Sequence, residues 1–143
     1  MKRRVLFLCT GNSCRSQMAE AIVNTRLGNH WEAVSAGTQP AGYVHPMAVE
    51  VLAELGIDWR GRSSKSADLF RDIPFDLVVT VCDSAAKNCP LWLGQGKRVH
   101  LGFPDPAAVT GSPEEVLAAF RQVRDAIAEQ IPALLQKWDD TDV

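Results

Sequence analysis

Short apolar runs alternate with segments of helical periodicity along most of the chain. Strands are predicted at about 4–8, 31–36, 76–82 and 97–101. Helices are predicted at about 16–27, 45–55, 66–70 and 112–138. Because strands that alternate with helices are typical of parallel pairing, the pattern predicts an α/β fold with helices on both faces of a parallel sheet.

The last helix has the clearest boundaries. Ser112 suits the N-cap, Pro113 the first helical position, and Glu115 the partner in a capping box. Pro132 lies late in this helix, where we expect a kink or a missing hydrogen bond. The residues from Asp139 onward are expected to be frayed.

Composition and charge limit the class of protein. The 143 residues, 46% hydrophobic and 22% charged, fit one globular domain over residues 1–143. A net charge of −2 gives no reason to expect a nucleic-acid or membrane partner. The apolar run of residues 5–8, after Arg4, is too short for a signal peptide and is interpreted as part of the first strand. We therefore expect a cytoplasmic monomer.

The chain has four cysteines, which in a reducing compartment are more often catalytic or redox-active than structural. A metal site is disfavoured, because the chain has no Cys-x2-Cys pair and its three histidines (His30, His45 and His100) are scattered. No metal is therefore predicted.

The segment that links the first strand to the first helix carries the strongest candidate chemistry. It consists of Cys9, Thr10, Gly11, Asn12, Ser13, Cys14, Arg15 and Ser16. Such a loop can turn its backbone N–H groups inward as an anion nest, and the helix N-terminus adds positive potential. Arg15 adds a fork that matches a tetrahedral oxyanion. Cys9 at the loop floor would then be favoured as a thiolate nucleophile.

A lone cysteine at the end of a buried strand is usually only a small core residue. The position of Cys9 after an apolar strand, with Gly11 and Asn12 in the loop and Ser16 after it, favours the oxyanion site. Cys14 is the least interpretable thiol: it is either a small residue that suits the loop or an off-pathway partner of Cys9.

Cys82 and Cys89 stand seven residues apart. Two helical turns would separate them by about 10.5 Å, whereas a disulfide needs Cα atoms within about 7 Å. If the stretch is helical, a bond between the two cysteines requires the helix to melt or loop out. The alternative is a pair of buried thiols with no redox role.

Asp105 lies between Pro104 and Pro106, just beyond the fourth strand. The prolines restrict the backbone on both sides of it. A carboxyl group held there can serve as a general acid for a leaving oxygen. An ordinary turn aspartate is the alternative.

These motifs together resemble the thioredoxin-coupled arsenate reductases built on the low-molecular-weight protein tyrosine phosphatase fold. The resemblance rests on the 9–20 segment, Ser35-Ala36-Gly37, His45-Pro46, Val79 to Cys82 with Cys89-Pro90, and Gly102 to Ala107. It implies a single-domain, four-stranded parallel sheet flanked by helices.

The resemblance also implies a thiol relay. Cys9 would attack arsenate held by Arg15 and the substrate-binding loop of residues 10–16, and Asp105 would protonate the departing oxygen. Cys82 would then attack Cys9, releasing arsenite and leaving a Cys9–Cys82 disulfide. Cys89 would resolve it, and thioredoxin would reduce the resulting Cys82–Cys89 disulfide. The stretch from Cys82 to about residue 93 is expected to lose helix on oxidation.

Some relatives in this resemblance bind potassium beside the loop, through positions that match Asn12, Glu20, Ser35 and an aspartate. Lys65 occupies the aspartate position here. Its ammonium would take the place of the ion, so no cofactor is expected. The same comparison assigns Asn12 and Ser16 to holding the loop and hydrogen-bonding the nucleophile.

Three other functions fit parts of the pattern. A phosphotyrosine phosphatase would use Cys9, Arg15 and Asp105 with water, but it usually carries an aromatic residue where this chain has Ala107. Weak phosphatase activity is compatible with the shared oxyanion site. A redox-sensing or oxyanion-binding module would not need Asp105, and a glutaredoxin-coupled reductase would not need both Cys82 and Cys89.

Overall fold

The computed structural model describes residues 2–82 and 96–141. Its four strands are β1 (Arg3–Cys9), β2 (Trp31–Gly37), β3 (Leu77–Thr80) and β4 (Lys97–His100). They form one sheet in the order β2-β1-β3-β4 with every pairing parallel. The predicted single-domain, four-stranded parallel sheet is confirmed.

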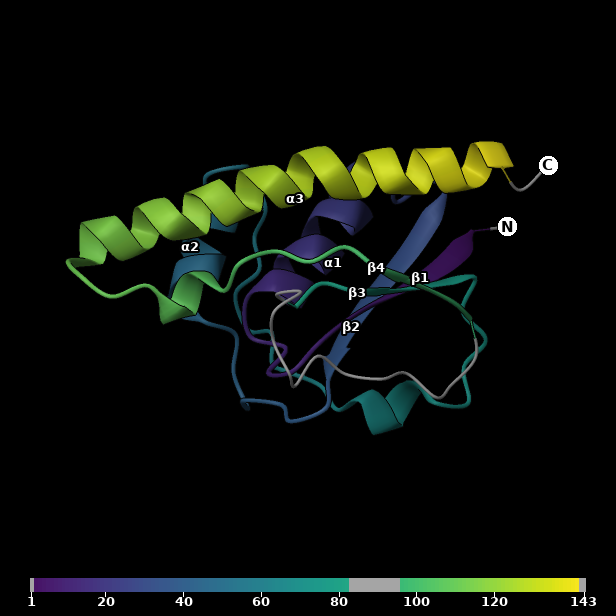
Figure 1. Ribbon diagram of the computed structural model, residues 1–143, viewed down its shortest axis with the longest axis horizontal. Helices are drawn as coiled ribbons and strands as arrows, with labels where there is room; N and C mark the ends of the chain where they lie inside the picture. The colour runs from purple at the N-terminus through teal and green to yellow at the C-terminus, as the bar shows by residue number, and fades with distance from the viewer. Residues whose placement is uncertain (1, 83–95, 142–143) are drawn as a thin grey trace.

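The helices are α1 (Arg15–Arg26), α2 (Pro46–Ala53) and α3 (Pro113–Thr141), with two short 3-10 helices, η1 (Ala67–Phe70) and η2 (Pro106–Ala108). Figure 1 shows α1, α2 and α3 on one side of the sheet and η1 on the other. Within the described residues, the second face is thus covered by a short 3-10 helix and the chain around it.

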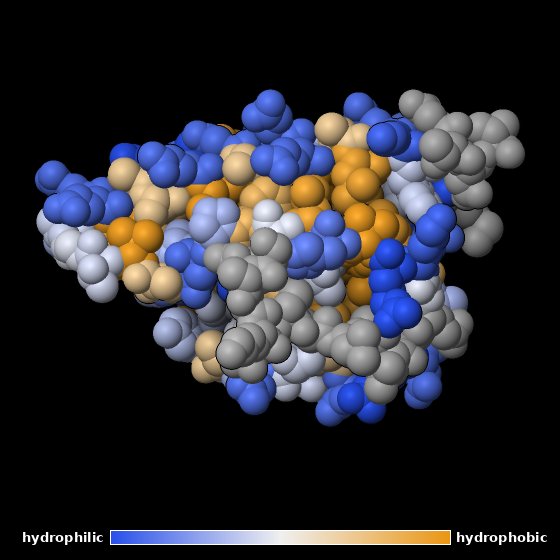
Figure 2. All heavy atoms as spheres, in the orientation of Figure 1, coloured by the Kyte–Doolittle hydropathy of each residue, from blue (hydrophilic) through white to orange (hydrophobic). Residues whose placement is uncertain are grey.

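The central strand β1 explains this two-sided arrangement. Val5 and Phe7 pack in the larger core with α1 and α3, whereas Leu6 and Leu8 pack in a smaller core with Phe75. Successive side chains of a strand point to opposite faces, so a continuous apolar run is buried on both. In Figure 2, polar residues lie along the outer side of α3 and an apolar band lies beneath it.

The apolar periodicity of helix α1 is weak because most of the helix is buried. Residues 16–23 are all buried, since the helix lies between the sheet and α3. A helix that is enclosed on most sides needs no polar face.

Helix α3 begins as predicted and ends later. Ser112 Oγ accepts the backbone N–H of Glu115 at 3.2 Å, and the Ser112 hydroxyl donates to Glu115 Oε1 at 3.3 Å. The helix continues to Thr141, beyond the end predicted near Trp138. Pro132 lies inside it. Among the described residues, no helix is both long and apolar enough to cross a membrane.

Candidate active site

The predicted site residues that the structure describes lie at the carboxyl edge of the sheet. Cys9 is the last residue of β1, Cys82 follows β3, and Asp105 follows β4. The Val81 N–H donates to the Leu8 carbonyl at 3.0 Å, so the next residues on these neighbouring strands, Cys9 and Cys82, continue at the same edge. Ligand sites of parallel α/β sheets lie at this edge.

The loop after Cys9 turns its carbonyl groups outward. The Thr10, Gly11 and Ser13 carbonyls accept the backbone N–H groups of residues 39, 41 and 45, each at 2.9 Å. In a trans peptide the N–H of the next residue points the opposite way. The N–H groups of residues 11, 12 and 14 therefore face the inside of the loop, where Asn12 N donates to Cys9 Sγ at 3.3 Å. This is the geometry of an anion nest.

The N-terminus of α1 strengthens the positive potential of the loop. Its N-cap residue, Cys14, makes no side-chain capping hydrogen bond, and the first turn of the helix has no acidic residue. The first N–H groups of a helix have no partner within the helix and attract anions. Asn12, with φ of 51°, takes the left-handed conformation that bends the chain into this turn.

Cys9 lies at the floor of the loop and is 3% exposed. Its sulfur is 2.9 Å from Ser16 Oγ, and Asn12 Nδ2 donates to the same Ser16 oxygen at 2.8 Å. Since Ser16 Oγ accepts from Asn12, its own proton is available for Cys9. The predicted contact between Ser16 and Cys9 is therefore present, and it offers the Cys9 sulfur a hydrogen-bond donor.

Arg15 and Asp105 approach the loop from its open side. Arg15 Nη1 donates to the Phe103 carbonyl at 3.0 Å, which fixes the guanidinium to the chain that carries Asp105. One Asp105 oxygen accepts the Ala107 N–H at 3.0 Å. A pocket of about 140 Å³ is lined by residues 9–15, Asp105 and Ala107. Drug-sized ligands occupy pockets of roughly 300–1,000 Å³, so this one suits a small anion.

Comparison with known proteins places the chain in a family. A family model described as low molecular weight phosphotyrosine protein phosphatase matches residues 4–142. The chain belongs to this family.

Several relatives of this chain are named arsenate reductases. One from Halalkalibacterium halodurans is 47% identical over 130 residues, covering 91% of this chain and 93% of the relative. One from Bacillus subtilis is 45% identical over 127 residues, covering 89% and 91%. A solved arsenate reductase in an oxidized state superposes with a TM-score of 0.75 at 31% identity, covering 94% of this chain and 98% of that one.

Other solved structures similar to this chain are a phosphatase and a thioredoxin-dependent enzyme. The low molecular weight protein tyrosine phosphatase of T. tengcongensis gives a TM-score of 0.70 at 31% identity, covering 95% and 99%. A thioredoxin-dependent arsenate reductase of Corynebacterium glutamicum gives 0.64 at 25% identity, covering 95% of this chain and 63% of that one.

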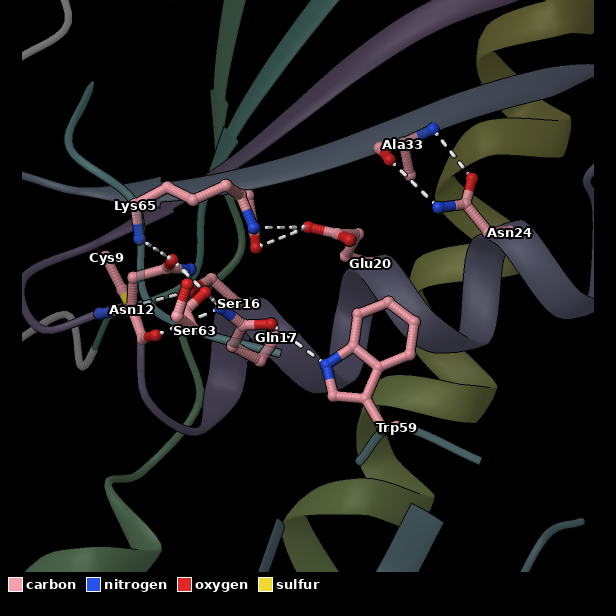
Figure 3. A network of polar contacts seen from close by, with 11 residues as sticks. Cys9, Asn12, Ser16, Gln17, Glu20, Asn24, Ala33, Trp59, Ser63 and Lys65 are labelled. Atoms are coloured by element: carbon pink, nitrogen blue, oxygen red, sulfur yellow. Dashed lines mark hydrogen bonds and ion pairs between the residues drawn. The ribbon is translucent and has the colours of Figure 1, made fainter. Parts of the chain in front are cut away.

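Lys65 occupies the position at which the resemblance to potassium-binding relatives predicts an aspartate ligand. Its Nζ is 3.2 Å from Glu20 Oε1, and the Ser35 hydroxyl donates to the same oxygen at 2.7 Å (Figure 3). Glu20 is nearly buried, with 7% of its side chain exposed. The Lys65 ammonium therefore forms an ion pair with this carboxylate.

The remaining cysteines of the phosphatase-like domain differ in their surroundings. Cys14 is buried and has a free thiol, and burial raises its pKa to about 11. Cys82 is 1% exposed and is disulfide-bonded, whereas the Cys9 thiol is free. Cys89 and the predicted switch segment beyond Cys82 lie outside the described residues.

Two residues of the site are absent from the sequence prediction. Gln17 is fully buried and contacts Asn12, and Trp59, 4% exposed, contacts Gln17. The stretch 58–66 reads as a polar loop, yet it carries this buried indole. The sequence offers two signs that these side chains are buried. Trp59 is a single tryptophan in a polar stretch, and Gln17 lies one helical turn before the apolar Ala21.

Proposed function

We propose that this protein reduces arsenate to arsenite. The observation that carries the proposal is the pocket of about 140 Å³ in which Cys9, the inward N–H groups of the loop, Arg15 and Asp105 converge. The naming of the family members as arsenate reductases supports the same substrate.

The first step uses the residues that line the pocket. The Cys9 thiolate attacks arsenic(V) while Arg15 and the loop N–H groups hold the other oxygens. Asp105 transfers a proton to the departing oxygen, which leaves as water. Its Oδ1 is held by the Ala107 N–H, so the other oxygen is the one positioned to carry the proton.

The second step takes two electrons from a pair of cysteines. Cys82 attacks Cys9 sulfur, the sulfur–arsenic bond breaks, and its electron pair leaves with arsenite as arsenic(III). The products are arsenite and a Cys9–Cys82 disulfide. The position of Cys82 beside Cys9 at the end of β3 supports this order.

In the third step Cys89 attacks Cys82 and releases the Cys9 thiolate. A dithiol reductant then reduces the Cys82–Cys89 disulfide. We propose thioredoxin as that reductant, on the motif Cys82–Cys89 and on the thioredoxin-dependent relative from Corynebacterium glutamicum.

The decisive experiment follows arsenate-dependent NADPH consumption with thioredoxin and its reductase, compared with glutaredoxin and glutathione. We expect turnover only with the thioredoxin system. Cys9→Ser should form no arsenite, and Cys89→Ser should form about one arsenite per enzyme and accumulate a Cys9–Cys82 disulfide, detectable by mass spectrometry. Normal turnover of Cys89→Ser with thioredoxin would contradict the relay.

A slow phosphatase activity follows from the same pocket, because a phosphoryl group and arsenate share charge and shape. Hydrolysis of an aryl phosphate requires Cys9, Arg15 and Asp105 but neither Cys82 nor Cys89. We therefore expect Cys89→Ser to keep this activity and Cys9→Ser to lose it. A Cys89→Ser variant with no such hydrolysis would contradict this side activity and leave the reductase proposal untouched.

We also propose that turnover does not depend on potassium, because Lys65 meets Glu20 at 3.2 Å. Rates in potassium and in tetramethylammonium salts of equal ionic strength should agree. A severalfold stimulation by potassium alone would contradict this role of Lys65.

A further inference from the structure

A buried indole begins a chain of hydrogen bonds that ends on Cys9 (Figure 3). Trp59 Nε1 donates to Gln17 Oε1 at 2.9 Å. Gln17 Nε2 faces the Asn12 backbone oxygen at 3.2 Å, Asn12 Oδ1 at 3.0 Å and the Ser63 carbonyl at 3.1 Å. An indole N–H can only donate, so it admits only the Gln17 oxygen, and the Gln17 nitrogen must face the carbonyl oxygens.

The orientation of Gln17 passes to Asn12. Asn12 Oδ1 accepts from Gln17 Nε2 and from the backbone N–H of Lys65 at 2.8 Å. Both are donors, so Asn12 Nδ2 is directed to Ser16 Oγ. The Ser16 oxygen accepts there, and its hydroxyl proton is left for Cys9 Sγ at 2.9 Å.

We infer that Trp59 and Gln17 are positioning residues that fix the direction of this chain, so that it delivers a donor to the Cys9 thiolate. The inference rests on the proposed role of Cys9 as nucleophile. A reversed Asn12 amide would instead accept the Ser16 proton and leave the sulfur without it. In a buried, low-dielectric site, successive hydrogen bonds also polarise one another.

Without the indole N–H, Gln17 Oε1 loses the partner that holds it away from the Asn12 oxygens. Lys65 N then remains as the single fixed donor to Asn12 Oδ1 among the contacts described. The Asn12 and Ser63 carbonyls and the Lys65 N–H still favour the original direction, but the reversed arrangement now costs less. A smaller share of molecules then has the Ser16 proton on Cys9.

A purely structural role for Trp59 is the competing explanation. Its ring is buried, and the Arg62 guanidinium lies 4.1 Å from the ring centroid. Loss of packing lowers thermal stability but does not change the pH at which Cys9 reacts. The pH dependence of Cys9 therefore separates the two roles.

The test compares Trp59→Phe with Trp31→Phe in the reduced full-length protein. Trp31 is 1% exposed and lies at the start of β2, at the opposite end of that strand from the loop. The readout is iodoacetamide alkylation of the Cys9 peptide as a function of pH, by mass spectrometry.

For Trp59→Phe we expect the half-maximal pH to rise by about 0.5–1, which slows alkylation at low pH about three- to tenfold. The high-pH rate and the Trp31→Phe profile should match the wild type. A Trp59→Phe profile that coincides with the wild type would overturn the inference.

Two further variants complete the test. Ser16→Ala should raise the half-maximal pH, and adding Trp59→Phe to it should change nothing more, because Trp59 acts through Ser16. Additive shifts would contradict the chain. If Trp59→Phe fails to fold, Gln17→Met gives the same comparison. Alkylation needs no arsenate, so absence of arsenate turnover would count against the proposed function alone.

Discussion

Replacing Arg15 by lysine keeps the positive charge and removes the planar fork. In the structure one arm of the guanidinium, Nη1, is bonded to the Phe103 carbonyl at 3.0 Å, and Arg15 lines the pocket. A lysine has one nitrogen and cannot hold both this carbonyl and two oxygens of an anion. A hydrogen bond to a charged group contributes about 1.5–3 kcal/mol, and 1.4 kcal/mol is a factor of ten.

We therefore expect Arg15→Lys to lower kcat/KM for arsenate by about ten- to a hundredfold. The assay is the thioredoxin-coupled NADPH reaction under subsaturating arsenate. Arg60→Lys is the matched control, because Arg60 is exposed and paired with Asp58 away from the pocket; it should stay within about twofold of wild type. An Arg15→Lys enzyme that also stays within twofold would refute the bidentate grip and place the oxyanion elsewhere.

Three further predictions concern the glycines around the loop, Cys14 and Glu54. A Cβ on Gly37 would clash with the Thr10 carbonyl oxygen, whereas one on Gly11 meets nothing closer than 3.7 Å. Gly37→Ala should therefore lower Tm clearly and Gly11→Ala should not, and equal Tm values would contradict the tight approach of β2 to the loop. Burial raises the pKa of Cys14 to about 11, so at pH 8 Cys14 should be alkylated far more slowly than Cys9. Cys14→Ser should keep its arsenate turnover. Faster alkylation of Cys14 than of Cys9 would contradict the view that Cys14 has no role in the reaction. The hydrogen bond from Arg121, with help from Arg124, lowers the pKa of Glu54 to about 2 from its ordinary 4.5. The ionised Glu54 therefore contributes stability that is complete above pH 4.5 and is lost as the pH falls toward 2. The decrease in Tm over that pH range should be smaller in Glu54→Gln than in the wild type, and identical decreases would refute this contribution.

The sequence was sufficient for the elements whose pattern is local. Apolar runs such as 77–79 predict buried strands, and the Ser112–Glu115 box predicts a helix start that the structure confirms. The placement of Cys9 and Asp105 at one edge could also be predicted, because the carboxyl ends of parallel strands lie at the same edge of a sheet.

The support of the loop was beyond the sequence, because it depends on tertiary contacts. Nothing local indicates that Trp59 folds back onto Gln17, 42 residues earlier in the chain, or that Lys65 contacts Asn12 through its backbone N–H and Glu20 through its ammonium. The end of α3 was also predicted too early. The polar residues after Trp138 suggest the end of the helix, but the helix continues to Thr141.

The hydrogen bonds of the outward carbonyls make the shape of the loop depend on the folding of distant segments. Their partners belong to residues 39, 41 and 45, and the Asn12 side chain needs Lys65, so the loop has its shape only when segments far apart in sequence have docked. Parallel sheets assemble from such non-local pairings and are slow to form. A partly folded chain would therefore present Cys9 as an ordinary thiol, so that the rate of Cys9 alkylation during refolding reports when the last of these segments has docked.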